Sequence, residues 1–261
     1  DNGLKGRLKK VIPIMPDSLT VSIDQQRTAI AACTRMFTDL KIMDHSGHVT
    51  IRLPDNSGFL IQSINASRSQ LLPGDIFAVG FDGEIIDGPS GTRPAGEYPI
   101  HSEIYKVRPD VNAVLHAHPK VPILFTIAEG AKLIPVTNHA YRWRNGIPVH
   151  GDTGHIDTAD LGRAMVETMG EANAVLLRAH GIVLASENIQ SLLIDGIHFD
   201  RNAQAQFDAS RLGTPIPMSE SEFDIFESRF DRANHGIKLW HHYASTAIEA
   251  GVMPEDWRDV V

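Results

Sequence analysis

Apolar residues recur at two different spacings along the chain, and each spacing predicts a type of element. Between residues 23 and 40 they recur every three or four positions, as in an amphipathic helix that Ser22 or Asp24 can cap. Short apolar runs between turn residues then predict strands at 48–53, 58–63, 75–80 and 83–87. The sequence FDGE before the last of them is typical of a hairpin turn.

Strands and helices continue to alternate in the second half of the chain. The patterns predict helices at 97–108, 119–130 and 158–170, the last of them ending at Gly170. They predict strands at 112–118 and 132–136, and two buried strand segments within 173–186. Two long amphipathic stretches close the chain, at 188–209 and 219–250.

These elements favour the α/β fold class. We expect three α/β/α layers, with a mostly antiparallel central sheet and helices on both of its faces. The βαβ pattern of dinucleotide-binding folds, with its G-x-G-x-x-G turn, is absent from the sequence. We expect an N-terminal arm at 1–21, a main domain at 22–212, and a C-terminal helical extension at 213–261 packed on the same domain.

Composition narrows the classes of partner. The 261 residues carry a net charge of −8 and no concentrated Lys/Arg stripe, which argues against a nucleic-acid partner. There is no run of about 18 apolar residues to span a membrane. The only cysteine, Cys33, excludes an internal disulfide, and the first residues lack a secretory apolar segment. We therefore expect a cytoplasmic location.

The segment NAVLHAHPK, residues 112–120, carries two histidines two positions apart. Side chains alternate along a strand, so His116 and His118 project from the same face. Two imidazoles so placed can reach one metal ion. His-x-His alone is a weak signal, because core or exposed histidines have the same spacing. Pro119 ends the strand directly after the pair, near a sheet edge where a cleft can open.

Two further polar residues strengthen the metal hypothesis. His180 lies in LLRAHGIVL, which is predicted to be an apolar strand ending at a glycine, and an unpartnered imidazole buried there would cost about 1–3 kcal/mol. Glu97 is predicted to start a helix just after a glycine-containing loop. Its ordinary role there is a favourable charge at the helix N-terminus, worth about 0.3–1 kcal/mol. Its functional role would be a general acid/base beside the metal.

Taken together, these residues resemble the class II aldolase/adducin family from about residue 25 to about 210. The family pattern appears as GEYPIHSEIYKVRPDVNAVLHAHP and, further on, VLLRAHG. Glu97 lies 19 residues before His116, and His180 lies 62 residues after His118, both close to the family spacing. The resemblance implies a class II aldolase-like fold and makes residues 22–212 the catalytic domain.

The resemblance also implies the chemistry of the site. His116, His118 and His180 would be the ligands of one divalent transition metal ion per subunit, which can be Zn²⁺, Mn²⁺, Fe²⁺ or Co²⁺. Glu97 would be the catalytic acid/base. The family implies a homo-oligomer, a tetramer or a multiple of one, with sites near subunit interfaces. A C-terminal tyrosine reaches the neighbouring site in family members; Tyr243 is the candidate, with packing as its ordinary role.

The chain departs from the family's sugar-phosphate enzymes in each phosphate-binding segment. His48 replaces an asparagine in GHVT, and IQSINAS at 61–67 lacks the usual glycine. Ala95 and Gly96 replace two serines before Glu97. Ala179 replaces the asparagine that usually precedes the last ligand. Because hydroxyl and N–H donors are what a phosphate needs, these changes argue against a sugar phosphate.

A subgroup that decarboxylates aromatic or pyridine dicarboxylates resembles this chain more closely, in G-H-V and in G-E-x-x-I-H-x-E-I-Y. His48 is a candidate to bind a substrate oxygen, with a solvent-facing strand histidine as the alternative, and Tyr141 is a candidate to line the pocket. A dicarboxylate also needs a cation. The candidates are Arg142, Arg144 and Arg68, and the ordinary role of each is a surface charge.

We therefore expect a metal-dependent carbon–carbon lyase that acts on a small molecule, foremost a decarboxylase of a hydroxylated aromatic or related carboxylic acid. An aldolase for a small hydroxy-carbonyl substrate and a non-heme iron oxygenase on the same scaffold are the alternatives among enzymes. An adducin-like binding module without catalysis is the alternative from another class; it predicts degraded ligands, whereas Glu97 and the three histidines are all present.

Overall fold

The computed structural model describes residues 21–261, so the arm predicted at 1–21 lies almost entirely outside the described residues. The helices are α1 (Ile23–Asp39), α2 (Pro99–Val107), α3 (Lys120–Ile127), α4 (Ala159–Met169), α5 (Ile189–Ala209), α6 (Glu220–Glu227) and α7 (Arg232–Glu249). The strands are β1 (His48–Arg52), β2 (Gly58–Gln62), β3 (Ile76–Gly80), β4 (Ile85–Asp87), β5 (Ala113–Ala117), β6 (Val149–His150), β7 (Ala174–Leu177) and β8 (Gly181–Ser186).

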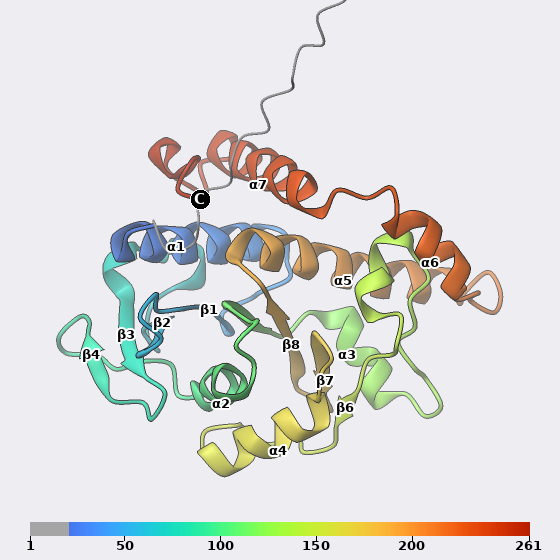
Figure 1. The fold of residues 1–261 in the computed structure, drawn as a ribbon, viewed down its shortest axis with the longest axis horizontal. Coiled ribbons are helices and arrows are strands. Elements are labelled where there is room, and N and C mark those ends of the chain that lie inside the picture. Colours follow the sequence, from blue (N-terminus) through green and yellow to red (C-terminus); the bar gives the residue numbers. More distant parts are fainter. Residues whose placement is uncertain (1–20) are drawn as a thin grey trace, which may run out of the picture.

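The strands form one sheet in the order β4-β3-β2-β1-β5-β8-β7-β6. Every neighbouring pair is antiparallel except β6 and β7, which are parallel. Figure 1 shows α1 and α5 on one face of the sheet and α2 and α4 on the other, with α7 lying outside α1 and α5. The predicted α/β/α layers and mostly antiparallel sheet are confirmed.

Two apolar cores fill the spaces between these layers. Alternation along β5 divides the strand between them, because Leu115 faces the core under α1 and α5 while Val114 faces the core above α2 and α4. His116 has the parity of Val114, so the histidine lies on the α2 side. Thr50 of β1 lies on that side too, and its hydroxyl is hydrogen-bonded to Tyr105 of α2 at 2.8 Å. His116 and Thr50 therefore share the α2 face of the sheet.

The strand predicted at 132–136 is wrong, because this segment has irregular backbone. Side-chain amides on α5 replace a strand neighbour. Asn202 bonds the backbone carbonyl of Ile134 at 2.9 Å, and Gln206 bonds the backbone N–H of Ile134 at 2.8 Å. The two amides lie one helical turn apart, so together they satisfy the backbone hydrogen-bonding groups of the irregular segment that lies against the helix.

The amphipathic stretch predicted at 219–250 is not one helix but two, α6 and α7. The break follows from a capping residue within the stretch. The Asp231 side chain accepts the backbone N–H of Asn234 at 3.0 Å and so starts α7. Ser219 starts α6 with a capping box to Glu222.

A buried ion pair ties α7 to the rest of the chain. Arg232 donates to both oxygens of Asp195 on α5, at 3.0 and 2.9 Å, and to Glu187 at 2.7 Å. The Asp195 side chain is only 4% exposed, and it also accepts the Ser186 hydroxyl at 2.6 Å. Two charges in this setting are tolerated because each is paired and hydrogen-bonded.

Replacing Asp195 with asparagine is expected to lower the free energy of unfolding by about 2 kcal/mol, because Arg232 loses its doubly bonded counter-ion while remaining largely buried. Urea unfolding followed by circular dichroism measures the change. Asp208→Asn, at an exposed position on the same helix, is the control and should leave the midpoint unchanged. Equal midpoints for the two variants would show that the pair does not stabilise this packing.

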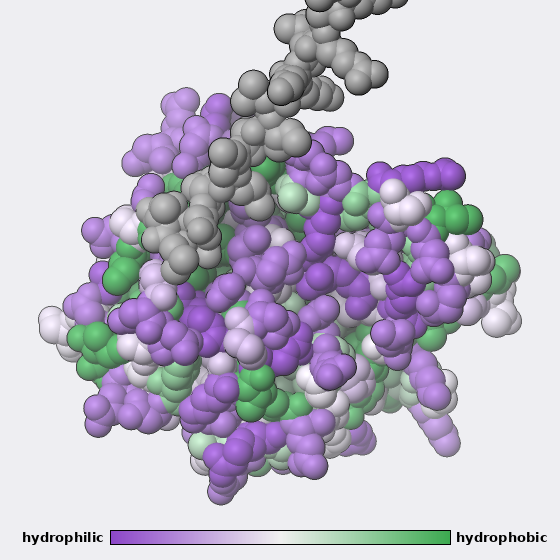
Figure 2. Space-filling model, viewed as in Figure 1, coloured by the Kyte–Doolittle hydropathy of each residue, from purple (hydrophilic) through white to green (hydrophobic). Residues whose placement is uncertain are grey.

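The outer surface is predominantly polar on the face drawn in Figure 2, where apolar residues form only small separate areas. Among the most exposed apolar side chains are Leu212 and Ile216, in the connection between α5 and α6. Within residues 21–261, none of the helices combines the length and the hydropathy that a membrane crossing requires.

Candidate metal centre

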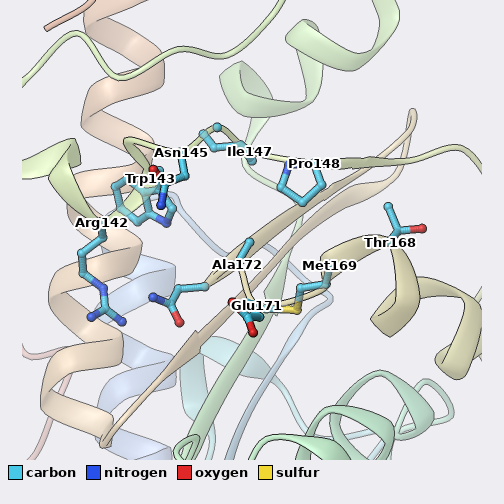
Figure 3. Close-up of a pocket in the computed structure, with 11 residues that line it drawn as sticks. Arg142, Trp143, Asn145, Ile147, Pro148, Thr168, Met169, Glu171 and Ala172 are labelled. Carbon is cyan, nitrogen blue, oxygen red and sulfur yellow. The ribbon is translucent and has the colours of Figure 1, made fainter. Parts of the chain in front are cut away.

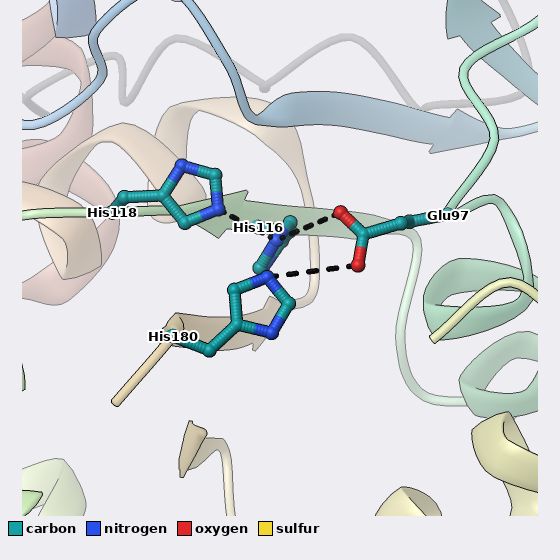
Figure 4. Close-up of side chains that lie close together, drawn as sticks. All are labelled: Glu97, His116, His118 and His180. Carbon is teal, nitrogen blue, oxygen red and sulfur yellow. Dashed lines mark hydrogen bonds and ion pairs between the residues drawn. The ribbon is translucent and has the colours of Figure 1, made fainter. Parts of the chain in front are cut away.

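Four side chains from three separate segments converge on the α2 side of the sheet: Glu97, His116, His118 and His180. Each offers one ligand atom, and these atoms all lie within 4.8 Å of one another. Figure 4 shows the three imidazoles and the carboxylate directed toward a common point. Glu97 lies in the turn two residues before α2, not at the helix start as predicted.

His116 is the most deeply buried member of this cluster, and the backbone fixes which of its nitrogens faces the centre. Its Nδ1 lies 3.0 Å from the carbonyl oxygen of Ile182 on the neighbouring strand β8. A carbonyl only accepts, so Nδ1 donates a proton to it and Nε2 is the nitrogen that faces the centre. That Nε2 lies 3.5 Å from Glu97 and 3.1 Å from Nε2 of His118.

His118 follows the last residue of β5 and presents its Nε2 to the centre and its Nδ1 outward. The Nδ1 atom lies 3.8 Å from the Asp44 carboxylate. Burial, and then the nearby imidazoles of His116 and His180, lower the pKa of His118 to about 4. Burial followed by His116 likewise lowers the pKa of His180. Both rings are therefore neutral at pH 7, the form in which histidine binds metals.

Glu97 remains ionised in spite of its partial burial. Burial raises its pKa, but the hydrogen bond and charge of His116, the backbone N–H of Ile156 and the charge of His180 together lower the pKa to about 2. The Ile156 bond is 3.0 Å long, and the second contact, from Nε2 of His180, is 3.6 Å. The centre thus pairs an ionised carboxylate with three imidazoles.

His180 lies in the tight turn between β7 and β8, not in a strand as predicted. Ala179, directly before it, has a φ of 54°, a left-handed conformation that is unfavourable for alanine. The following residue must be glycine, because a Cβ on Gly181 would lie 2.5 Å from the carbonyl of Ala117 and 2.9 Å from the His118 ring. Backbone strain on one side and close packing on the other hold His180 against the pair on β5.

Ala179→Gly is expected to raise the free energy of unfolding by about 1 kcal/mol, because glycine adopts this φ without steric strain. Thermal and urea unfolding measure the gain. Ala205→Gly, in the ordinary helical backbone of α5, is the matched control and should lose about 0.5–1 kcal/mol. A loss at both positions would contradict the strain at Ala179.

This donor set fits a divalent transition-metal ion. Three imidazoles and one carboxylate are ligands that suit Zn²⁺, Mn²⁺, Fe²⁺ and Co²⁺ alike. The protonated Nδ1 of His116 satisfies the second-layer contact that metal-binding histidines commonly make, since it donates to a backbone carbonyl. The 3.1 Å separation between Nε2 of His116 and Nε2 of His118 places two lone pairs side by side, as a shared cation requires.

His48 lies beside the cluster and is buried, so the alternative of a solvent-facing histidine is wrong. It pairs with His116 across β1 and β5, with ring centroids 5.5 Å apart. Its Nδ1 is buried without a hydrogen-bond partner among residues 21–261. Burial, followed by the charges of His116 and His101, lowers the pKa of His48 well below its usual value. A neutral imidazole with an unused nitrogen thus borders the centre.

Arg68 is also buried, which corrects the expectation of a surface charge. Its Nε donates to the carbonyl of Gly47 at 3.0 Å, and its Nη1 donates to the carbonyls of Ser63, at 3.3 Å, and Ala66, while Nη2 makes no hydrogen bond within the described residues. Its charge contributes to the low pKa of His48, next to the cluster, and Asp44 acts on it in turn. The guanidinium is therefore anchored through two nitrogens, with the third available.

The other two candidate arginines, Arg142 and Arg144, form ion pairs with acidic residues outside the cluster. Arg142 lies 3.3 Å from Asp195 and 3.4 Å from Glu187. It also borders a cavity of about 630 Å³ that contains no member of the cluster, between the 3₁₀ helix η4 (Asn138–Trp143) and the end of α4 (Figure 3). Arg144 pairs with Glu220, Asp224 and Glu227.

Within this chain, the two candidate tyrosines, Tyr141 and Tyr243, make their contacts away from the cluster. Tyr141 packs against Phe226 and Phe230, with ring centroids 5.7 and 5.8 Å away. The Tyr243 hydroxyl accepts from Arg201 at 2.7 Å. A role of Tyr243 at the site of a neighbouring subunit stays a prediction.

Sequence reasoning missed three residues that surround the cluster. Asp44 lies beside His118, and His155 lies 3.5 Å from Glu97. His101 of α2 is hydrogen-bonded to Thr50 at 2.8 Å and faces His48. The periodicity of α2 could have indicated His101, which is one helical turn from Glu97. Asp44 and His155 lie in loops, whose course the sequence pattern does not predict.

Comparison with known proteins agrees with the family resemblance seen in the sequence. Residues 28–207 match the family described as the class II aldolase and adducin N-terminal domain. The chain is 29% identical over 201 residues to a 3,4-dihydroxyphthalate decarboxylase of Arthrobacter keyseri, covering 72% of this chain and 79% of the relative. It is 26% identical over 159 residues to a 5-deoxy-D-ribulose 1-phosphate aldolase of Bacillus thuringiensis serovar kurstaki, covering 61% and 73%.

The fold agrees with the sequence match. The crystal structure of an aldolase II superfamily protein from Pseudomonas syringae superimposes with a TM-score of 0.77 at 23% identity, covering 92% of this chain and 98% of that one. The family match spans well over half of the chain and includes Glu97 and all three clustered histidines. The chain therefore belongs to the class II aldolase and adducin family.

Proposed function

We propose that this protein is a divalent-metal-dependent decarboxylase of a hydroxylated aromatic carboxylic acid. The observation that carries the proposal is an ionised carboxylate, Glu97, held against three imidazoles in a setting without the phosphate-binding hydroxyls of sugar-phosphate aldolases. Ala95 and Gly96 precede Glu97 where those enzymes have serines. The likeness to a 3,4-dihydroxyphthalate decarboxylase supports the same substrate class.

The three histidines would hold one metal ion per chain through their Nε2 atoms. When bound, the ion would polarise a substrate oxygen and stabilise the negative charge that builds up as the carbon–carbon bond breaks. Neutral histidine ligands leave the positive charge of the ion undiminished for this task. The family uses a divalent metal, and which metal serves this chain is a question for elemental analysis.

Glu97 would move the proton. With a pKa of about 2 the carboxylate is ionised at pH 7, so it starts as a base and takes the proton of a substrate hydroxyl. The bond between the ring carbon and the carboxylate group of the substrate then breaks, CO₂ leaves, and the electron pair stays on the ring carbon. Glu97 returns the proton to that carbon, so the atoms and charges balance and no co-reactant is consumed.

Arg68 would bind a second carboxylate of the substrate. Two of its nitrogens are anchored on backbone carbonyls, which fixes the direction of the available Nη2. His48, whose ring lies 5.5 Å from that of His116 and whose pKa the Arg68 charge helps to lower, would offer a further polar contact to the same ligand. Arg142, the cation preferred from sequence, is neutralised by two carboxylates and is the weaker choice.

Arg68→Lys is expected to raise the KM for a hydroxylated dicarboxylate about tenfold or more, since lysine cannot reproduce the anchored guanidinium. The KM for the matching monocarboxylate should change little. Steady-state CO₂ release with both substrates gives the comparison, and Arg93→Lys, at an exposed position, is the control. An equal rise for both substrates would mean that Arg68 has only a structural role.

The proposal is tested by reconstituting the protein with Zn²⁺, Mn²⁺, Fe²⁺ and Co²⁺ separately and assaying hydroxybenzoates and hydroxyphthalates for CO₂. Release of one CO₂ per substrate, without O₂ uptake, is the expected result. Aldehyde formation from hydroxy-carbonyl compounds in the absence of CO₂ would favour an aldolase, as the Bacillus thuringiensis relative suggests. Uptake of O₂ would favour an oxygenase. Family members are often oligomeric, and light scattering of the same preparation would test for a homo-oligomer.

A further inference from the structure

A second group of histidines lies in a separate part of the chain. His139 comes from η4, His198 from α5 and His235 from α7, and one ligand atom of each lies within 4.8 Å of the others. They border a cavity of about 490 Å³ between these helices. The ten residues that line it are Thr137, Asn138, His139, His198, Arg201, His235, Lys238, Leu239, His242 and Tyr243.

The ring orientations of these histidines argue against a second metal site. His139 is stacked on His198 at 4.1 Å and 11°, and on His235 at 5.0 Å and 18°. An imidazole binds a metal along a lone pair in its own ring plane, so three stacked rings cannot all direct lone pairs to one ion. In the four-residue cluster His118 and His180 are also nearly parallel, at 5.3 Å and 13°, but the His116 ring is turned 89° and 85° from them, and the second group has no ring turned in this way.

The charges around the cavity also disfavour a cation. Arg201 and Lys238 line it, and no carboxylate is among the ten lining residues. Within residues 21–261, neither of the two forms a salt bridge. Asp200 is close enough for Arg201 to influence its pKa, but it lies outside the lining. Two permanent positive charges thus face the cavity without acidic partners there.

Donor groups complete the cavity wall. His139 has a buried Nδ1 without a hydrogen-bond partner among the described residues, and His198 is largely buried. Arg201 is oriented by its bond to the Tyr243 hydroxyl, which leaves its other N–H groups available. A neutral imidazole can donate one N–H, and it can take up a second proton when an anion approaches.

We propose that this cavity binds a small polyanion with carboxylate or phosphate groups, held by Arg201 and Lys238 and by N–H groups of the stacked histidines. The site is built from α5, α7 and η4 and shares no residue with the Glu97 cluster. It therefore does not depend on the proposed decarboxylase activity, and either could be present without the other.

Isothermal titration of the full-length, metal-loaded protein with inorganic phosphate, and separately with phthalate, tests the proposal. We expect at least one of the two probes to bind, with its affinity reduced about tenfold or more in Arg201→Gln and unchanged in Arg211→Gln. Arg211 is exposed beyond the end of α5 and outside the cavity lining. The preferred probe identifies the phosphate or the carboxylate as the ligand group.

Three outcomes would overturn the proposal. The first is that neither probe binds. The second is that binding survives in Arg201→Gln but is lost in His116→Ala, which would locate the anion on the metal of the other cluster. The third is that the protein takes up two Zn²⁺ per chain and that His198→Asn removes one of them. The last result would make the stacked histidines a cation site. Circular dichroism of Arg201→Gln and His198→Asn verifies that both variants fold.

Discussion

His116→Ala is expected to lose its bound metal and its catalytic activity together. His116 is fully buried, its Nδ1 is fixed by the Ile182 carbonyl, and its Nε2 faces both His118 and Glu97. Loss of a second-layer contact typically weakens metal binding 10–100-fold, and loss of a direct ligand should exceed that. Elemental analysis after dialysis measures the metal, and CO₂ release measures the activity.

The matched control for this variant is His45→Ala. His45 lies in the loop beside Asp44, but its side chain is 91% exposed. This control should retain its metal and its activity, so a general effect of losing a histidine is excluded. If His116→Ala kept a full equivalent of metal and normal turnover, the assignment of the centre would be wrong.

Glu97→Gln is expected to keep the metal while kcat falls about 10²–10⁴-fold, the usual contribution of a general acid/base. Glutamine preserves the shape of the side chain and the contact with the Ile156 N–H, but it cannot take up a proton. The three histidines are unchanged, so metal content should stay near the wild-type value. Steady-state kinetics together with elemental analysis separate the two effects.

Glu129→Gln serves as the control, because Glu129 is exposed in the turn that follows α3. A Glu97→Gln variant that lost the metal as well as activity would make Glu97 a ligand rather than a proton carrier. Full activity with bound metal would remove Glu97 from the chemistry altogether.

The layers of the fold could be predicted from spacing, and so could the segments that carry the cluster. Alternation on residues 113–117 placed His116 on one face, and that face is where Thr50 and His101 also lie. Periodicity also predicted α1, with Ser22 or Asp24 as the candidate cap, and the structure shows Ser22 as the cap through a local capping box. These features depend on neighbours a few positions apart.

What the sequence pattern missed depends on distant neighbours. Residues 132–136 are apolar enough for a strand, but Asn202 and Gln206, about 70 positions away, satisfy their backbone instead. The sequence pattern predicts that Arg68 is a surface charge. It is buried instead, because the packing of β1 and β2 brings the carbonyls of Gly47 and Ser63 within hydrogen-bonding distance of its side chain. His180 reaches the centre through a strained turn at Ala179, which spacing cannot reveal.

The central claim is that the Nε2 atoms of His116, His118 and His180 hold one divalent metal ion in each chain. The most direct measurement is anomalous diffraction from a crystal of the purified protein, recorded above and below the absorption edge of its metal. We predict one anomalous peak per chain within bonding distance of all three Nε2 atoms, about 2.0–2.1 Å for zinc. A sole peak among His139, His198 and His235, or a peak that none of the three clustered histidines contacts, would contradict the account.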